Sequence, residues 1–386
     1  MGSHKIRVGM IGYQFMGKAH SHAYRDLPFY FEQEVVPVLQ AIAGRNEEKV
    51  KKEAEKLGFL SYETDWKKLI EREDIDLIDI VTPNNTHAEM AIAAAESGKH
   101  VLCEKPLALT AEQAERMYQA VKKNRVIHMV THNYRFAPAV QYAKKLIEDG
   151  RIGQIRHIRA TYLQDWMMDP NFPLVWRLRK EITGTGTLGD IGAHSIDLAR
   201  YLVGEIDEVM GTMKTFVKKR PLGETKGGLS AKVESEHMGD VEVDDTAAFL
   251  ANFENGALGV FEATRYAGGN RNGNRFEING SKGSIRWNME KMNLLQVYFD
   301  DDEPGLQGFR TIHCTEEHHP YAEVYWPAGH GIGYEHTFIN LLSCFMDGVA
   351  KGVAPRPNFE DGLMNQRVME AVVNSTEKRQ WIKIPK

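Results

Sequence analysis

Short apolar runs alternate with helical patterns over the first third of the chain. The apolar runs are bounded by glycine, proline or polar residues, which is typical of buried parallel strands, and they cover residues 6–11, 36–43, 76–82, 125–131 and a run from His100 that stops at Lys105. The helical patterns between them begin at Lys18 and recur at 46–57, 85–97 and 110–124, whereas 27–31 reads as an irregular aromatic stretch. This alternation predicts a doubly wound parallel sheet, an α/β Rossmann fold.

The pattern changes after about residue 150. A strand is predicted at 154–164, a helix at 189–203 and a further strand at 294–299. Asn255-Gly256 predicts a hairpin between 246–254 and 257–264, and a second hairpin is predicted across 280–283. The charged segment 218–240 reads as an exposed loop. We therefore expect a Rossmann domain at 5–131 and an α+β domain at 132–386 with a large, mostly antiparallel open sheet.

Composition changes this picture little. A chain of 386 residues is long enough for two domains, and 42% hydrophobic and 26% charged residues with a net charge of −5 are ordinary for a soluble protein. No concentrated positive face indicates a nucleic-acid or membrane partner, and no apolar run reaches the length of a membrane span. Three scattered cysteines (Cys103, Cys314 and Cys344) and the lack of a signal-peptide pattern predict a reduced, cytoplasmic protein.

The first strand leads into Gly12-Tyr13-Gln14-Phe15-Met16-Gly17 and then a helix, which is the context of a dinucleotide-binding fingerprint. Gly12 would supply the tight turn, and Gly17 would let the helix pack closely on the strand. Gln14 stands where the middle glycine is usual, so the pyrophosphate site is expected to be altered and not abolished.

The second strand ends at Gly44-Arg45, where dinucleotide sites often carry an acidic residue that holds the ribose. An uncharged residue followed by arginine slightly favours NADP over NAD. Arg45 could equally stack on adenine or face water, so both cofactors stay open.

Two further segments carry groups that suit acid–base chemistry. Lys105 lies at the carboxyl end of its strand, where ligands bind in open α/β sheets, and Pro106 ends that strand. In the helix after Gly184–Thr187, Asp190, His194 and Asp197 are spaced i, i+4 and i+7, which places them on one face. Each feature alone could be a solvated polar position.

The ordered set of motifs resembles the glucose–fructose oxidoreductase/inositol dehydrogenase (Gfo/Idh/MocA) family. The matching motifs are 12–17, Thr82-Pro83-Asn84 with His87, Glu104-Lys105-Pro106, Asn133-Tyr134-Arg135 and Asp190-x-x-x-His194, and they span essentially the whole chain. Residues 15–20, 162–166 and 331–334 point, within the family, towards enzymes that act on anhydrosugars, and the likeness to inositol dehydrogenases is looser.

The resemblance implies an NAD- or NADP-dependent dehydrogenase that oxidises a secondary hydroxyl of a sugar, anhydrosugar or cyclitol, and that forms a homodimer or homotetramer. Its implied catalytic residues are Lys105, Asp190 and His194. Its implied cofactor-binding residues are Gly12, Gln14, Phe15, Met16, Gly17, Gly44, Arg45, Thr82, Pro83, Asn84, His87, Glu104, Lys105 and Asn133. Its candidate substrate-binding residues are Lys105, Arg135, Asp165, Trp166, Trp176, Arg177, Asp190 and His194.

This chemistry needs a base and a cation at one oxygen, because the hydroxyl loses its proton as the carbon loses hydride. Histidine takes protons near neutral pH, and lysine stabilises a developing alkoxide, so either His194 or Lys105 could be the formal base. The histidines form no coherent set of metal ligands, and we expect no metal. Two alternatives remain: a same-fold enzyme with tightly bound NAD(H) that makes 3-oxo-glycosides or cleaves glycosides by transient oxidation, and a non-catalytic nucleotide sensor.

Overall fold

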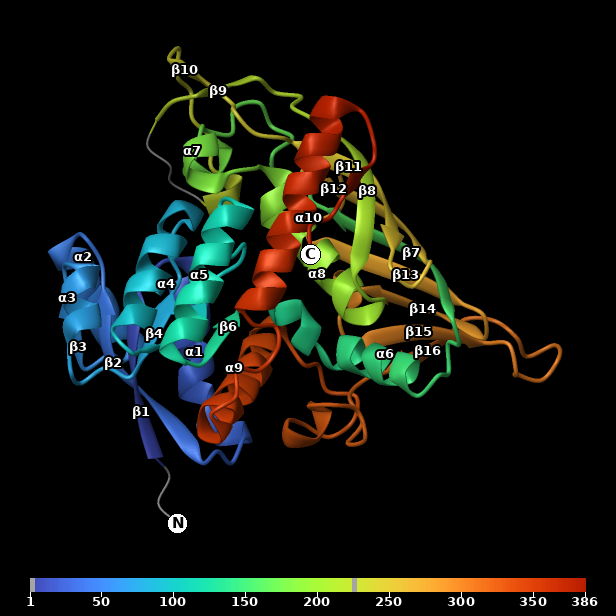
Figure 1. The fold of residues 1–386 in the computed structure, drawn as a ribbon, viewed down its shortest axis with the longest axis horizontal. Helices are drawn as coiled ribbons and strands as arrows, with labels where there is room; N and C mark the ends of the chain where they lie inside the picture. Colours follow the sequence, from blue (N-terminus) through green and yellow to red (C-terminus); the bar gives the residue numbers. More distant parts are fainter. Residues whose placement is uncertain (1–3, 224–227) are drawn as a thin grey trace. The chain divides into compact units, whose positions relative to one another are not determined.

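The computed structural model describes residues 4–223 and 228–386, which fall into two compact units. The first unit contains the chain up to Phe136 together with Ile332–Met364. The second contains Ala137–Gly331 and Asn365–Lys386. Each unit has its own sheet (Figure 1).

The described strands of the first unit form a parallel sheet in the order β3-β2-β1-β4-β5-β6. They are β1 (His4–Ile11), β2 (Val35–Ala43), β3 (Ser61–Glu63), β4 (Leu77–Ile80), β5 (His100–Cys103) and β6 (His128–Val130). The Rossmann topology is thus confirmed. Because β1, β4 and β5 are parallel neighbours, the segments that follow them leave from the same edge of the sheet.

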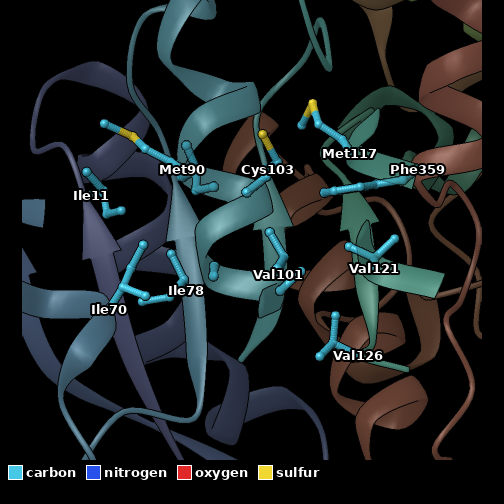
Figure 2. Close-up of a cluster of buried hydrophobic side chains, with 14 of the residues drawn as sticks. Ile11, Ile70, Ile78, Met90, Val101, Cys103, Met117, Val121, Val126 and Phe359 are labelled. Carbon is cyan, nitrogen blue, oxygen red and sulfur yellow. The ribbon is translucent and has the colours of Figure 1, made fainter. Parts of the chain in front are cut away.

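One face of this sheet is covered by α3 (Trp66–Glu71), α4 (His87–Glu96) and α5 (Ala111–Asn124). Figure 2 shows the apolar core beneath them, in which Val101 and Cys103 of β5 lie among side chains of α4 and α5. Helix α1 (Phe15–Tyr30) covers the opposite face, with α9 (Tyr334–Lys351) packed beside it. Helix α2 (Glu47–Leu57) begins at an Asn46 cap and ends at left-handed Gly58.

One local expectation for this unit was wrong. Residues 27–30 continue α1, although Pro28 is inside the helix, because a proline in the last turn removes one hydrogen bond while Leu27 stays fully buried. At the start of α4, the Thr86 side chain makes no capping hydrogen bond, and its hydroxyl donates to the carbonyl of Pro83. The segment 332–364, which includes α9, gave no sequence signal that it belongs to this unit.

The second unit is built on a nine-stranded sheet in its described part, in the order β16-β15-β14-β13-β7-β12-β11-β8-β17. The strands are β7 (Ile155–Leu163), β8 (Ile206–Lys214), β11 (Thr246–Phe253), β12 (Leu258–Thr264), β13 (Gly273–Gly280), β14 (Gly283–Asn288), β15 (Leu294–Phe299), β16 (Arg310–His313) and β17 (Ile382–Lys383). Both predicted hairpins are present, and the described pairs are antiparallel apart from β7 with β12.

Helices α6 (Pro138–Glu148), α8 (Ala193–Leu202) and the later part of α10 (Phe359–Lys378) pack on one face of this sheet (Figure 1). Along β11, β12 and β14, buried residues alternate with more exposed ones, so the other face is open. Short helical turns occur at 84–86, 133–136, 176–178, 180–183, 188–192, 228–230, 289–291 and 322–324.

The segment 218–240 is only partly the exposed loop that its charge predicted. Within it, β9 (Lys219–Pro221) pairs with β10 (Met238–Asp240), and residues 224–227 lie outside the described residues. Arg220 is fully buried, because its guanidinium donates to the carbonyls of Met167, Asp169 and Phe172. These hydrogen bonds therefore link the β9–β10 pair to the loop that follows β7.

Candidate active site

The turn after β1 needs both of its outer glycines. Gly12 has a φ of +107°, and a Cβ there would lie 2.9 Å from the carbonyl oxygen of Val81. A Cβ on Gly17 would lie 2.8 Å from the carbonyl oxygen of Gly12. The turn is therefore tight, and α1 packs directly on it.

The first turn of α1 suits an anion. Gln14 is the N-cap but makes no capping hydrogen bond with its side chain, and this first turn contains no acidic residue. Phe15 is 65% exposed, so no apolar packing closes the helix end. The backbone N–H groups of such a turn, with the positive end of the helix dipole, match a pyrophosphate. The residues present thus fit a dinucleotide.

Gly44, at the end of β2, has a packing reason to be glycine. A Cβ there would lie 2.1 Å from the ring of Tyr13, which belongs to the glycine turn. Arg45 is exposed beside it. The missing side chain at residue 44 therefore makes room for Tyr13, a contact that the motif did not predict.

His87 holds two turns of the same sheet edge together. It is fully buried, with Nδ1 3.0 Å from the carbonyl oxygen of Pro106 and Nε2 2.9 Å from that of Thr82. Burial lowers its pKa. His87 thus links the Thr82–Asn84 segment to the Lys105-Pro106 turn. Both of its ring nitrogens are used in contacts with backbone carbonyls.

Glu104 and Lys105 follow β5 at this edge. Glu104 is buried and accepts hydrogen bonds from Thr131, at 2.6 Å, and from His20, at 3.0 Å. Burial alone would raise the pKa of Glu104, but His20, Lys105 and Thr131 together outweigh burial, and the pKa is lowered. Lys105 is partly exposed.

Asn133 and Arg135 are buried and engaged with the returning segment 332–364. The Asn133 amide donates to the Thr337 hydroxyl at 2.8 Å. Arg135 lies 3.5 Å from the Asp361 carboxylate, and both side chains are 3% exposed. These contacts hold the turn after β6 against α9 and α10.

In the second unit, Asp190 lies in a π-helical turn, Leu188–Gly192, that leads directly into α8. The buried Asp244 carboxylate accepts hydrogen bonds from the backbone N–H of Gly186, at 2.7 Å, and of Leu188, at 2.9 Å. Burial nevertheless raises the pKa of Asp244. Single π turns occur frequently at functional sites.

Two guanidinium groups flank Asp190. Arg265, at the end of β12 and fully buried, donates to the Asp190 carboxylate, and Nε of Arg177 is 3.9 Å from the same oxygen. Burial lowers the pKa of Arg177, with Asp190 opposing the effect. The structure thus brings together two of the predicted residues, Asp190 and Arg177, with Arg265, which the sequence did not indicate.

Aromatic rings pack against both guanidinium groups. The ring of Trp166 is 5.1 Å from the Arg265 guanidinium, and the ring of Trp176 is 4.4 Å from that of Arg177. Both tryptophans keep partial exposure. Asp165 pairs with the exposed Arg271 at 3.1 Å.

His194 and Asp197, which follow Asp190 at i+4 and i+7, are both buried in α8. His194 is 6% exposed, and its ring is tilted against Tyr162 of β7. Asp197 is 1% exposed and accepts a hydrogen bond of 2.9 Å from Asn365.

No three or more His, Cys, Asp or Glu side chains in the described part of the chain gather so that they could hold a metal ion. No helix in it combines the length and apolar character that crossing a membrane requires.

Comparisons with known proteins match both halves. Residues 6–132 match the model of the oxidoreductase family with an NAD-binding Rossmann fold, and residues 140–286 match the GFO/IDH/MocA C-terminal domain. The chain is 46% identical to levoglucosan dehydrogenase from Pseudarthrobacter phenanthrenivorans over 98% of both sequences.

Solved structures agree over nearly the whole chain. An oxidoreductase domain protein from Kribbella flavida is 50% identical, with a TM-score of 0.95 over 99% of this chain and 100% of that one. A levoglucosan dehydrogenase in complex with NADH and levoglucosan is 46% identical, with a TM-score of 0.94 over 99% of each chain. This chain belongs to the Gfo/Idh/MocA family of oxidoreductases, with an N-terminal NAD-binding Rossmann fold.

Proposed function

We propose that this protein is a nicotinamide-dependent dehydrogenase that oxidises a secondary hydroxyl of an anhydrosugar of the levoglucosan type. The observation that carries the proposal is the 46% identity to levoglucosan dehydrogenase over 98% of both chains. The flanked carboxylate of Asp190 supports it, because a polyol offers hydroxyl donors to a fixed acceptor.

For the cofactor we propose NAD or NADP, held by the turn Gly12–Gly17, by the segments at Gly44-Arg45 and Thr82–Asn84, and by Glu104, Lys105 and Asn133. The uncapped first turn of α1 would receive the pyrophosphate. When bound, the nicotinamide supplies the hydride acceptor. A solved structure of levoglucosan dehydrogenase is a complex with NADH, which gives NAD the stronger support.

For the reaction we propose distinct roles for three side chains. His194 or Lys105 takes the hydroxyl proton, and Lys105 stabilises the developing alkoxide. Asp190 accepts a hydrogen bond from a substrate hydroxyl and orients it, since two guanidinium groups hold its carboxylate in place. Trp166, Trp176 and Arg177 would line the sugar site, together with Asp165 and Arg135.

The test is a screen of monosaccharides, anhydrosugars and inositols with NAD⁺ and NADP⁺, followed by nicotinamide absorbance. We expect reduction with an anhydrosugar, and at least a hundredfold loss of kcat in Lys105→Ala and His194→Ala, with cofactor binding retained. Full-rate turnover by Lys105→Ala would overturn the proposed roles. Substrate conversion without any net absorbance change would instead identify a transient-oxidation enzyme.

We also propose a homodimer or homotetramer that uses the open face of the nine-stranded sheet. Met210, Leu250 and Val260 are directly opposite one another on adjacent strands and 38–40% exposed. The same row continues into Arg159 and Glu277, which form an ion pair. An exposed apolar patch beside paired charges is typical of a protein interface. Sedimentation of Leu250→Glu beside the unaltered protein tests this: a monomeric variant supports it, and a monomeric unaltered protein overturns it.

A further inference from the structure

Three buried ionisable side chains meet under the strand end that carries Lys105. His20 of α1 places Nδ1 2.9 Å from an oxygen of Asp79 and Nε2 3.0 Å from an oxygen of Glu104. Their exposed fractions are 1%, 0% and 4% for His20, Asp79 and Glu104. The Gfo/Idh/MocA motifs singled out Glu104 but gave no role to His20 or Asp79.

Strand alternation explains how the two carboxylates meet. Ile78 and Ile80 of β4, and Cys103 of β5, belong to the apolar core under α4 and α5, which Figure 2 shows around Cys103. Asp79 and Glu104 alternate with them and therefore point to the opposite face, which α1 covers. Two carboxylates on adjacent strands would repel each other there without a cation between them.

With both carboxylates ionised, the two contacts require both ring nitrogens of His20 to donate. A neutral imidazole has one N–H, so one of the two carboxylates would face a nitrogen lone pair. An imidazolium satisfies both, and its charge offsets one of the two buried negative charges. Burial favours the neutral ring, but Asp79 and Glu104 together outweigh burial and raise the pKa of His20 to about 10.

We propose that His20 is a positioning residue for Lys105, acting as a cation that bridges Asp79 and Glu104 and ties the end of β5 to the helix of the glycine turn. His20 is three positions after Gly17 in α1, and Glu104 precedes Lys105 directly. The bridge therefore links the helix that would bind the cofactor to the lysine that would meet the substrate oxygen. The proposal rests on the proposed function for Lys105.

Other titratable groups around the bridge keep one charge state near neutral pH. Burial raises the pKa of Tyr24, Cys103 and Tyr334 and lowers that of His87. Lys105 adds a positive charge that helps to lower the pKa of Glu104. If the charge at residue 20 changes, none of these neighbouring groups gains or loses a proton to offset it. The change therefore acts on Glu104 and Lys105.

The kinetic test compares His20→Gln with His22→Gln. Both residues are in α1, but His22 is half exposed and pairs with Asp26 at 3.2 Å. We expect His20→Gln to lower kcat roughly ten- to a hundredfold, because a small displacement of a catalytic group has effects of that size. NADH affinity, measured by fluorescence titration, should change less than about threefold, and His22→Gln should match the unaltered enzyme.

The double variant His20→Gln/Asp79→Asn separates charge from shape. It removes the second carboxylate along with the cation, and an amide pair can still form a hydrogen bond. We expect it to recover at least about tenfold of the kcat lost in His20→Gln. If His20 serves only the stability of the fold, the folded fraction of His20→Gln will have full kcat, and that result overturns the proposal.

A third measurement does not depend on turnover. Trace acetylation at pH 8, quantified by mass spectrometry, gives the reactivity of Lys105 relative to the exposed Lys49. Loss of the His20 cation leaves excess negative charge that holds the proton on the lysine, so we expect at least about threefold slower labelling of Lys105 in His20→Gln alone. Unchanged labelling contradicts the bridge. Slower labelling in a protein that oxidises no polyol would reject the proposed function and keep the bridge.

Discussion

Arg265 donates a hydrogen bond to the carboxylate of Asp190, and it does so from a fully buried position 75 residues further along the chain. Arg177 lies near the same carboxylate oxygen, and the Asp190 side chain is 32% exposed. A carboxylate held by two guanidinium groups stays ionised and keeps its orientation. Asp190 is therefore suited to accept a hydrogen bond and poorly suited to act as the base.

Replacing Arg265 by lysine should weaken this arrangement without removing the charge. Lysine lacks the planar fork of arginine, so Asp190 would lose its fixed orientation. We expect kcat/KM for the sugar to fall about tenfold or more, as measured by initial rates. Arg116→Lys, on the exposed side of α5, is the matched control. If kcat/KM is equal in Arg265→Lys and the unaltered enzyme, Arg265 does not contribute to the function of the site.

Arg45 provides a test of cofactor choice. Its side chain is exposed next to Gly44, at the strand end where a ribose is usually bound. If it contacts a 2′-phosphate, Arg45→Ala should lower kcat/KM for NADP by about tenfold relative to NAD. Lys49→Ala, one turn into α2, should leave that ratio unchanged. If the ratio of kcat/KM for NADP to kcat/KM for NAD is the same in the unaltered protein and in both variants, Arg45 does not contact the 2′-phosphate.

The charged state of His20 should make stability fall at alkaline pH. Its pKa is raised to about 10 in the folded protein, and unfolded histidine titrates near 6.5. The stabilisation is therefore complete below about pH 6.5 and declines as the pH rises towards about 10. We expect the difference in urea midpoint between the unaltered protein and His20→Gln to shrink between pH 6.5 and 9.5. A difference that grows over this range would contradict a charged His20.

The titration of His128 should make the protein less stable at acidic pH, the opposite of the effect of His20. The Nδ1 of His128 accepts the backbone N–H of Phe359 at 3.1 Å, and burial lowers its pKa to about 4. Unfolded histidine binds a proton at higher pH, so this contribution to stability is present above about pH 6.5 and is lost as the pH falls towards 4. Between pH 7 and 4.5, the urea midpoint should fall less in His128→Asn than in the unaltered protein. His313→Asn, exposed in β16, should behave like the unaltered protein.

Local signals in the sequence predicted the Rossmann sheet and both hairpins, but they did not predict helices α6, α9 and α10. The glycine turn, the helix at 46–57 and the Asn255-Gly256 hairpin depend on the conformations that a few neighbouring residues allow, and such preferences can be recognised in the sequence. The Rossmann sheet followed from the alternation of strands and helices.

What the sequence could not predict depends on contacts between distant residues. Arg265 is an ordinary arginine after a strand until the fold brings it to Asp190. From the sequence, Gly44 was interpreted as a position that lacks the usual acidic residue. In the structure, the ring of Tyr13 occupies the space that a side chain at residue 44 would need. His20 and Asp79 are separated by 59 positions and were invisible as a pair.

The π turn before α8 has a consequence for protein engineering and for alignment with relatives. One turn of π-helix holds about one residue more than an α-helical turn, so Leu188–Gly192 is equivalent to a single-residue insertion that the helix has absorbed. Deleting one residue there would restore regular α-helix and rotate Asp190 by about 100° around the axis relative to α8. A relative one residue shorter in this segment would present another side chain to Arg265, even if every other motif matched.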